Sequence, residues 1–177
     1  MRRILLTAVL LLFVSLAKAS MVLLGAAIPA SQMENVAANE RLIASAFQRK
    51  DGSTIYLDKA WHGLHFLLTG TAYDSSSLLG KAILGGRAVG EDQGYGPMRV
   101  VSPEQVKAIA DVLSKVTPEE LSARYDPAAL DKAQIYPTIW VRDGAEGLKY
   151  LLSFFGPLQA FYIKAAENGQ AVVLIIA

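Results

Sequence analysis

Residues Leu57–Gly70 read LDKAWHGLHFLLTG, and their pattern predicts an amphipathic helix over 59–69. Asp58 stands where a capping carboxylate accepts hydrogen bonds from the first turn, and Gly70 stands just beyond the last turn. With about 100° between successive residues, the helix divides into two adjoining stripes. The apolar stripe comprises Trp61, Leu64 and Leu68, and the polar stripe comprises Asp58, His62, His65 and Thr69. We therefore expect the first stripe to face the core and the second to border it.

The two histidines of this helix are the only ones in the chain. They are one helical turn apart beside a carboxylate, and imidazole is the side chain best suited to proton transfer or metal binding near neutral pH. We expect His65 and Asp58 to form an acid–base pair, with Trp61 and His62 beside them as binding residues. The plainer interpretation is that Asp58 only caps the helix, His65 forms a hydrogen bond inside the core, and His62 is exposed.

A metal site would need a further ligand from elsewhere in the chain, because two imidazoles and one carboxylate leave a tetrahedral site incomplete. Glu91 or Asp92 could supply that ligand. Nothing in their spacing from the helix singles out either one, and the sequence therefore predicts no metal site. It also leaves the identity of any cofactor unknown.

A second candidate site lies in the glycine-rich stretch Glu91–Pro97, EDQGYGP, with Arg99 just beyond it. Glycines on both sides of Tyr95 allow backbone amides to approach a ligand closely. The guanidinium of Arg99 can grip a carboxylate or a phosphate through two hydrogen bonds. The stretch matches neither the phosphate-binding loop nor the dinucleotide fingerprint. The plainer interpretation is a turn that leads into a strand over 98–101.

Two further residues are candidates for binding. Lys59 follows the expected cap, where a cation opposes the positive end of the helix dipole, so we expect it to pair with an acid or a ligand. Tyr136 precedes Pro137 and, together with Trp140, could line an aromatic wall or a partner surface. A solvated lysine and ordinary core packing are the plainer interpretations.

The rest of the chain predicts an α+β fold, because helices outnumber strands and do not alternate strictly with them. The apolar runs 21–28 and 171–176 are expected to be neighbouring strands in a small mixed sheet, with 171–176 near its centre. Several helices are expected to pack on this sheet, over about 31–49, 103–113, 147–155 and 158–168, with shorter ones after Thr117–Pro118 and Asp126–Pro127.

The composition limits the classes of function. The chain has 177 residues, of which 53% are hydrophobic and 19% charged, which fits one folded domain and excludes a disordered chain. It has no cysteine, which excludes disulfides, cysteine metal sites and thiol catalysis. The net charge of +1 provides no basic field for nucleic acid, and no G-x-S-x-G nucleophile motif is present.

The first 19 residues predict a signal peptide. Two arginines precede an apolar run of 13 residues, and Ala17-Lys18-Ala19 has the small-x-small pattern that a signal peptidase recognises. Cleavage would leave residues 20–177 as a single exported domain, periplasmic or secreted, with no stable membrane span. Two alternatives are an uncleaved anchor and a true start at Met21, which would make the protein cytoplasmic.

Several motifs resemble the YfbM-like family, a bacterial domain family of unknown function with an α+β fold. The most specific motif is LDKAWHGLHFLLTG itself. The others, in order along the chain, are AILGG at 82–86, GYGPMR at 94–99, IYP at 135–137 and FYIKAAENGQAVV at 161–173. The resemblance covers 21–177 and implies the fold, but it assigns no catalytic residue. Members of the family start at the equivalent of Met21, without a signal peptide, and often carry an acid where this chain has His62.

Two functions follow from these candidates. The first is a non-catalytic binding or interaction module for a small ligand or a protein partner, which the sparse ionisable groups favour. The second is a small hydrolase- or lyase-like enzyme with His65 and Asp58 as the acid–base pair and Arg99 as an anion clamp. An enzyme requires His65 at the wall of a pocket, with Tyr95 or Arg99 across it. A binding module can bury His65 instead.

Overall fold

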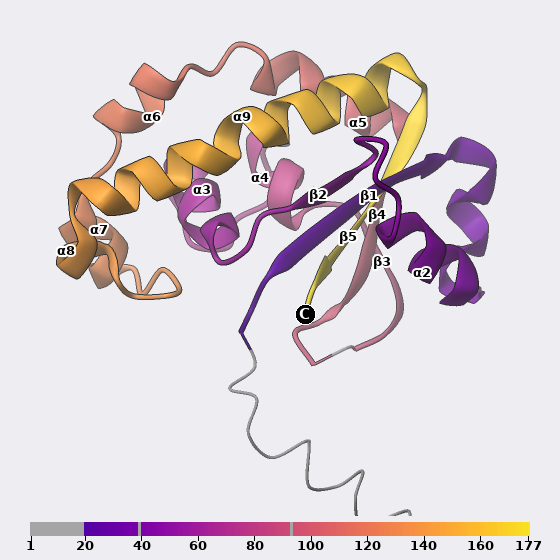
Figure 1. Ribbon diagram of the computed structural model, residues 1–177, viewed down its shortest axis with the longest axis horizontal. Coiled ribbons are helices and arrows are strands. Elements are labelled where there is room, and N and C mark those ends of the chain that lie inside the picture. Colours follow the sequence, from indigo (N-terminus) through magenta and orange to yellow (C-terminus); the bar gives the residue numbers. More distant parts are fainter. Residues whose placement is uncertain (1–19, 39, 93) are drawn as a thin grey trace, which may run out of the picture.

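The computed structural model describes residues 20–38, 40–92 and 94–177 (Figure 1). Its strands are β1 (Leu23–Pro29), β2 (Thr54–Tyr56), β3 (Arg87–Asp92), β4 (Pro97–Val101) and β5 (Gln170–Ile176). Its helices are η1 (Ala30–Ala38, a 3₁₀ helix), α2 (Glu40–Phe47), α3 (Ala60–Thr69), α4 (Leu78–Leu84), α5 (Pro103–Leu113), α6 (Pro118–Ala123), α7 (Pro127–Lys132), α8 (Trp140–Asp143) and α9 (Ala145–Glu167). The expected signal peptide lies outside the described residues.

The five strands form one sheet in the order β2-β1-β5-β4-β3. β1 and β5 pair along their whole length, from Leu23 opposite Ile176 to Pro29 opposite Gln170. This pairing confirms that the two apolar runs are neighbours and that the C-terminal run is central. Every neighbouring pair is antiparallel, so the sheet is not mixed. Apolar patterning reports burial, whereas strand direction depends on how the intervening helices return the chain.

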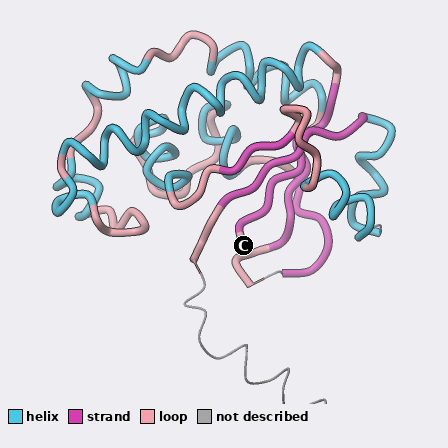
Figure 2. Tube along the Cα trace, in the orientation of Figure 1, coloured by secondary structure: helices cyan, strands magenta, loops and turns pink. Residues whose placement is uncertain are grey.

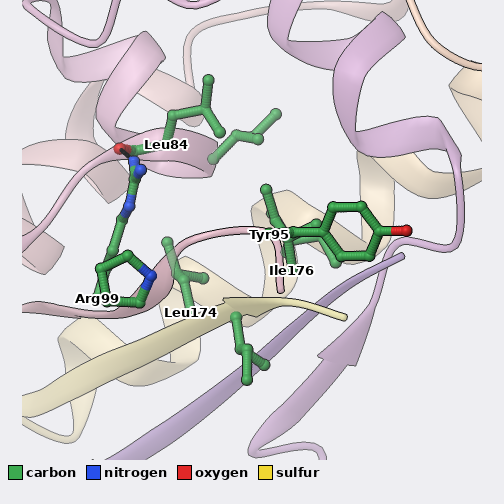
Figure 3. A pocket seen from close by; sticks show the side chains of 9 residues that line it. Leu84, Tyr95, Arg99, Leu174 and Ile176 are labelled. Atoms are coloured by element: carbon green, nitrogen blue, oxygen red, sulfur yellow. Dashed lines mark hydrogen bonds between the residues drawn. The ribbon is translucent and has the colours of Figure 1, made fainter. Parts of the chain in front are cut away.

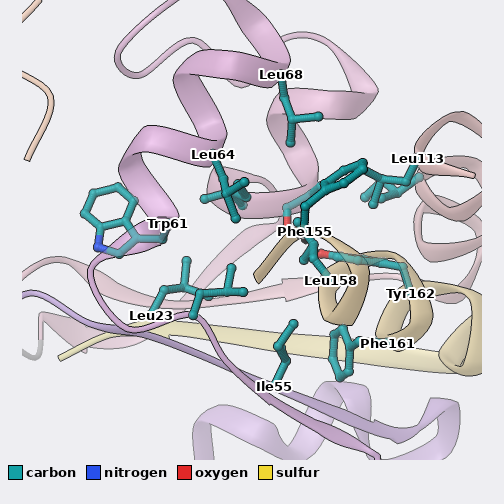
Figure 4. Packing of buried hydrophobic residues seen from close by; sticks show 14 of the residues in the cluster. Leu23, Ile55, Trp61, Leu64, Leu68, Leu113, Phe155, Leu158, Phe161 and Tyr162 are labelled. Carbon is teal, nitrogen blue, oxygen red and sulfur yellow. Dashed lines mark hydrogen bonds between the residues drawn. The ribbon is translucent and has the colours of Figure 1, made fainter. Parts of the chain in front are cut away.

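Helices cover both faces of the sheet, which explains why β1 and, after Gln170, β5 are apolar on both faces (Figure 2). Leu23, Val172 and Leu174 join the larger core, under α3, α4, α5 and α9 (Figure 4). The alternate residues belong to a smaller core with η1 and α2, which comprises Ala26, Ile28, Val36, Ala46, Val89, Met98, Val100, Ala171 and Val173. The observed architecture is therefore α+β, as the sequence predicts.

α3 is the helix predicted from the opening motif, and its C-terminal boundary is confirmed. Gly70 ends it with a φ of +73°, and the Gly70 N–H donates to the carbonyl of Phe66. The N-terminal prediction is wrong, because Lys59 occupies the capping position and no side chain caps the helix. Asp58 has a φ of +46°, and its carboxylate accepts hydrogen bonds from two tyrosine hydroxyls instead.

Gly63 lets α3 pack closely against α8 and α9. A Cβ atom at this position would lie 2.8 Å from Trp140 Cη2 and 2.7 Å from Leu151 Cδ2. Gly63→Ala is therefore expected to lower the free energy of unfolding by about 1–3 kcal/mol, although alanine is the better helix former. Ser153→Ala on the exposed side of α9 serves as a control, with a change within about 0.5 kcal/mol. Urea denaturation measures both, and a stabilised Gly63→Ala variant would contradict this packing.

α9 corrects another expectation. The sequence predicts two helices separated at Gly156-Pro157, but one helix of 23 residues passes through both positions. Gly156 and Pro157 are exposed, whereas Phe155 and Leu158 on either side are buried in the larger core. A glycine before proline also removes the Cβ clash that disfavours helical backbone there. Packing on both sides of the proline therefore holds the helix together.

The first expected helix, 31–49, is also divided differently. The structure has the 3₁₀ helix η1 and then α2, with residue 39 between them outside the described residues. The helices α5, α6 and α7, in which proline follows the capping residue, begin where the sequence predicts. None of the helices in the described part of the chain is both long and apolar enough to cross a membrane.

Candidate functional site

A pocket of about 240 Å³ opens between α3, the end of α4 and the β3–β4 hairpin. We call it the aromatic pocket, and its lining residues are Met21, Trp61, Tyr73, Leu84, Tyr95, Arg99 and Ile176. Three of these residues, Trp61, Tyr95 and Arg99, are binding candidates from two separate motifs of the sequence. Figure 3 shows the adjoining recess, where Arg99 extends toward Leu84 and the Tyr95 ring lies by Ile176. This recess holds only about 10 Å³, close to the space of one water molecule.

The turn between β3 and β4 places Tyr95 at the pocket. The Asp92 carboxylate accepts hydrogen bonds from the backbone N–H groups of Gly94 and Gly96, at 2.7 and 3.0 Å. Gly94 and Gly96 have φ values of +106° and +96°, which favour glycine. The glycine-rich stretch thus folds around an aspartate, and Tyr95 between the two glycines is 37% exposed. Asp92 therefore shapes the turn, which is a role that the sequence analysis did not assign to it.

Arg99 on β4 is half-buried, and its side chain spans from the strand to α4. Its Nη1 donates to the carbonyl of Leu84, at the C-terminal end of α4. A cation is favourable there because the carbonyl end of a helix carries partial negative charge. The ion pairs among the described residues involve Arg87, Arg142 and Lys149, so the Arg99 charge has no carboxylate partner in that part of the chain.

Two aromatic residues of the pocket lining, Trp61 and Tyr73, both contact the ring of His62. The rings of Trp61 and His62 lie parallel with centroids 4.7 Å apart, and the His62 and Tyr73 centroids are 4.8 Å apart. Trp61 is nearly buried, and its indole N–H donates to the carbonyl of Met21. Tyr73 is 68% exposed, in the loop after α3. The pocket thus joins one fixed indole to one accessible phenol ring.

Two hydrogen bonds to the backbone fix the ring of His62 between Trp61 and Tyr73. Its Nδ1 accepts a hydrogen bond from the Tyr136 N–H at 3.0 Å, so that Nε2 carries the proton and donates to the Ala72 carbonyl, also at 3.0 Å. The ring is fully buried, and burial lowers the pKa of His62. His62 is therefore a neutral structural link between three segments of the chain, and the interpretation that it is exposed is wrong.

His65 lies one turn further along α3 and is also fully buried. Neither of its ring nitrogens forms a hydrogen bond with a described residue, so it does not make the expected bond within the core. Burial, reinforced by the neighbouring His62, lowers the pKa of His65 to about 4, although the nearby Asp74 opposes the shift. The ring is consequently neutral at physiological pH, and it does not line the aromatic pocket.

Asp58 is engaged elsewhere. Its carboxylate accepts hydrogen bonds from the hydroxyls of Tyr150 at 2.7 Å and Tyr56 at 3.2 Å. Burial and the Asp58 carboxylate both raise the pKa of Tyr150, which keeps that phenol protonated. The structure therefore does not bring Asp58 and His65 together as an acid–base pair.

The comparisons with known proteins agree with this fold. A family model described as "Domain of unknown function (DUF1877)" matches residues 20–175. The chain belongs to this family. Protein YfbM of Escherichia coli (strain K12) is 32% identical to it over 126 residues, which are 68% of this chain and 75% of YfbM. The expected resemblance to the YfbM-like family is thereby confirmed.

A solved structure supports the DUF1877 fold independently. The crystal structure of YfbM from Escherichia coli, described as a protein of unknown function, matches with a TM-score of 0.70. The match covers 89% of this chain and 100% of the YfbM chain, with 21% sequence identity. This likeness confirms the fold, and neither comparison assigns a function to the DUF1877 domain.

Two candidate residues of the DUF1877 domain lie outside the aromatic pocket. Lys59 is half-buried at the start of α3 and forms no ion pair with a described acid. Tyr136 contributes its backbone N–H to His62, and Trp140 is fully buried in the larger core. Within the described ranges, no three side chains of the metal-binding types lie close enough to hold an ion.

Sequence reasoning missed four of the pocket residues of the DUF1877 domain. Tyr73 lies in a polar loop that has no distinguishing pattern, and its role depends on the tilted contact of its ring with that of His62. Met21 lies two residues before β1, Ile176 ends β5, and Leu84 ends α4. The pairing of β1 with β5 could be inferred from the two apolar runs, but the proximity of α4 to these strand ends could not.

Proposed function

We propose that this chain is a non-catalytic binding protein whose small ligand occupies the aromatic pocket. The observation that carries this proposal is the convergence of Trp61, Tyr95 and Arg99 on one cavity. Tryptophan, tyrosine and arginine are the residue types that contribute most binding energy at recognition sites. A cavity near 240 Å³ lies just below the usual range for small-molecule sites of about 300–1,000 Å³, which suits a small ligand.

The arrangement of the ionisable groups favours binding over catalysis. A catalytic imidazole must reach the substrate or be oriented by a partner, and His65 lines no wall of the aromatic pocket. His62 has both ring nitrogens in hydrogen bonds with the backbone. The Asp58 carboxylate is held by two tyrosines. The enzyme alternative therefore has no support from the positions of these three side chains.

The two tryptophans of the chain provide a direct test. Trp61 lines the aromatic pocket, whereas Trp140 is fully buried in the core and donates to the carbonyl of Ile135. In ¹H–¹⁵N NMR spectra, members of a fragment library that bind the pocket should shift the Trp61 indole resonance and leave that of Trp140 unchanged. A library that shifts neither resonance, or always shifts both together, would contradict the proposal.

Two tyrosine variants sharpen this test. Tyr73→Ala removes one wall of the aromatic pocket and is expected to weaken binding of any such fragment by about 3–10-fold, the range for one aromatic contact. Tyr56→Ala is the matched control, because Tyr56 is also exposed but lies outside the pocket lining. Equal affinities for the Tyr73→Ala and wild-type proteins, measured by NMR titration, would place the ligand elsewhere.

The proposal also places the protein outside the cytoplasm. Its support is the sequence pattern of residues 1–19, with two arginines, an apolar run and Ala17-Lys18-Ala19. N-terminal sequencing of the natural protein is expected to find Ser20 as the first residue. If the natural protein instead begins with Met1 or Met21, cleavage before Ser20 is refuted.

A further inference from the structure

The walls of the aromatic pocket differ sharply in chemistry. Trp61, Tyr73 and Tyr95 supply aromatic rings, and the remaining uncharged lining residues, Met21, Leu84 and Ile176, are aliphatic. Among the described residues that line the pocket, Arg99 is the sole charged one. A ligand that matches these walls has a flat apolar body and one group that complements a single cation.

Arg99 is prepared to receive an anion. One of its N–H groups donates to the Leu84 carbonyl, which fixes the guanidinium between β4 and α4. A guanidinium has five N–H donors, so it keeps donors for a ligand beyond the one that Leu84 accepts. No carboxylate of the described chain pairs with it. A half-buried cation without such a partner gains most from a planar anion that can accept two parallel hydrogen bonds.

Size and charge narrow the class of anion. A single guanidinium neutralises one negative charge, whereas a phosphate monoester carries nearly two at neutral pH and would bring uncompensated charge against apolar walls. A carboxylate carries one charge and has the planar geometry of the guanidinium. The volume of about 240 Å³ suits a body of one or two fused rings.

We propose that the aromatic pocket binds a small monocarboxylate that carries a flat aromatic ring, with the ring against Trp61 and Tyr73 and the carboxylate on Arg99. This inference rests on the proposed binding function and specifies its ligand class. The carboxylate belongs either to a free aromatic acid or to the C-terminal aromatic residue of a peptide. Both sources present the same ring and the same anion.

The test compares isosteric acid and amide probes by titration of the Trp61 indole resonance. Indole-3-acetate and phenylacetate represent free acids, N-acetylphenylalanine represents a peptide C-terminus, and the corresponding amides remove the charge. An acid that fits is expected to bind with a Kd of about 1 mM or lower, as its size allows. Its amide is expected to bind at least about tenfold more weakly, because the charge-assisted hydrogen bonds to Arg99 are lost.

Two arginine variants complete the design. Arg99→Gln removes the cation and is expected to reduce the difference between acid and amide to less than about twofold, since the charge interaction is gone. Arg87→Gln is the matched control on the adjacent strand β3, where Arg87 pairs with Glu34 at the surface, and it should keep the wild-type preference. The acid–amide comparison in the wild-type protein decides the question even where Arg99→Gln fails to fold.

Each outcome has one meaning. Binding of the free acids alone assigns a metabolite-like acid as the ligand source, and stronger binding of N-acetylphenylalanine assigns a peptide C-terminus. Amides that bind as tightly as acids would overturn the carboxylate assignment. The carboxylate assignment would also be overturned if other library fragments shift the Trp61 resonance but none of the acids does. In both cases the proposed binding function would stand. If no compound of any class shifts Trp61, both proposals fall.

Discussion

Replacing His62 by alanine is expected to lower the free energy of unfolding by about 3–5 kcal/mol. The substitution leaves the part-buried Tyr136 N–H and Ala72 carbonyl without their partner, at about 1–3 kcal/mol for each group that water does not reach. It also opens a cavity beside Trp61, whose ring then loses its stacking contact. Urea denaturation followed by circular dichroism measures the change.

Tyr73→Ala provides the comparison for this prediction. It removes the other ring that contacts His62, but Tyr73 is largely exposed, so its loss is expected to cost no more than about 1 kcal/mol. A His62→Ala variant within 1 kcal/mol of the wild-type protein, by the same measurement, would show that the imidazole is not the structural link described above. The histidine would then again be a candidate for a functional role.

The second large effect is a loss of stability in acid. Burial lowers the pKa of His65 from 6.5 to about 4, so the unfolded chain takes up this proton at a higher pH than the folded chain does. The folded state therefore has its full stability with respect to His65 above pH 6.5, and this contribution is lost as the pH falls toward 4. At about 1.4 kcal/mol for each pKa unit, the free energy of unfolding should fall by about 3 kcal/mol over this range. His62, whose pKa is also lowered, adds in the same direction.

His65→Leu isolates the contribution of this ring. Leucine has a similar volume and removes two buried nitrogens that form no hydrogen bond with a described residue, so the variant should be at least as stable as the wild-type protein at neutral pH. Its stability should also fall less between about pH 7 and pH 4, because one of the two titrating imidazoles is gone. Denaturation curves at several pH values test both points. A strongly destabilised variant with unchanged pH dependence would contradict this description of His65.

The predictions from sequence succeed where local pattern and burial coincide. The helix around Trp61 is present and ends at a glycine, and both features follow from neighbouring residues alone. Its expected polar stripe is wrong, because His62 and His65 are buried together with the apolar residues of the helix. The runs that become β1 and β5 are apolar throughout because both faces of the sheet are covered. The Ser102 and Thr117 capping boxes are likewise local, and the structure has both.

The predictions fail where distant contacts override local preference. Pro157 is a strong helix breaker, but buried residues on both sides keep α9 continuous. Asp58 has the right residue type for a helix cap, yet two tyrosine hydroxyls hold its carboxylate, one of them 92 residues away. A helical wheel shows only the residues of one helix, so it cannot reveal partners from other segments. The same reason explains why His62 could not be recognised as buried.

The structure likewise brings together only some of the candidate site residues. The chemistry of Trp61, Tyr95 and Arg99 makes them binding candidates, and the fold brings them to one cavity. The spacing of Asp58 and His65 predicts a shared helix face, but the fold separates their interactions. Spacing within one helix predicts a shared face, whereas a shared cavity also depends on the segments that pack against that face.

A crystallographic screen with small aromatic carboxylic acids shows directly whether the aromatic pocket is the binding site. We expect electron density for these fragments in that pocket, with the ring beside Trp61 and the carboxylate at Arg99. The larger open groove between α5 and α9, lined by Lys107, Asp111 and Ile163, should stay empty. Fragments that occupy this groove while the aromatic pocket remains empty would contradict the assignment of the binding site.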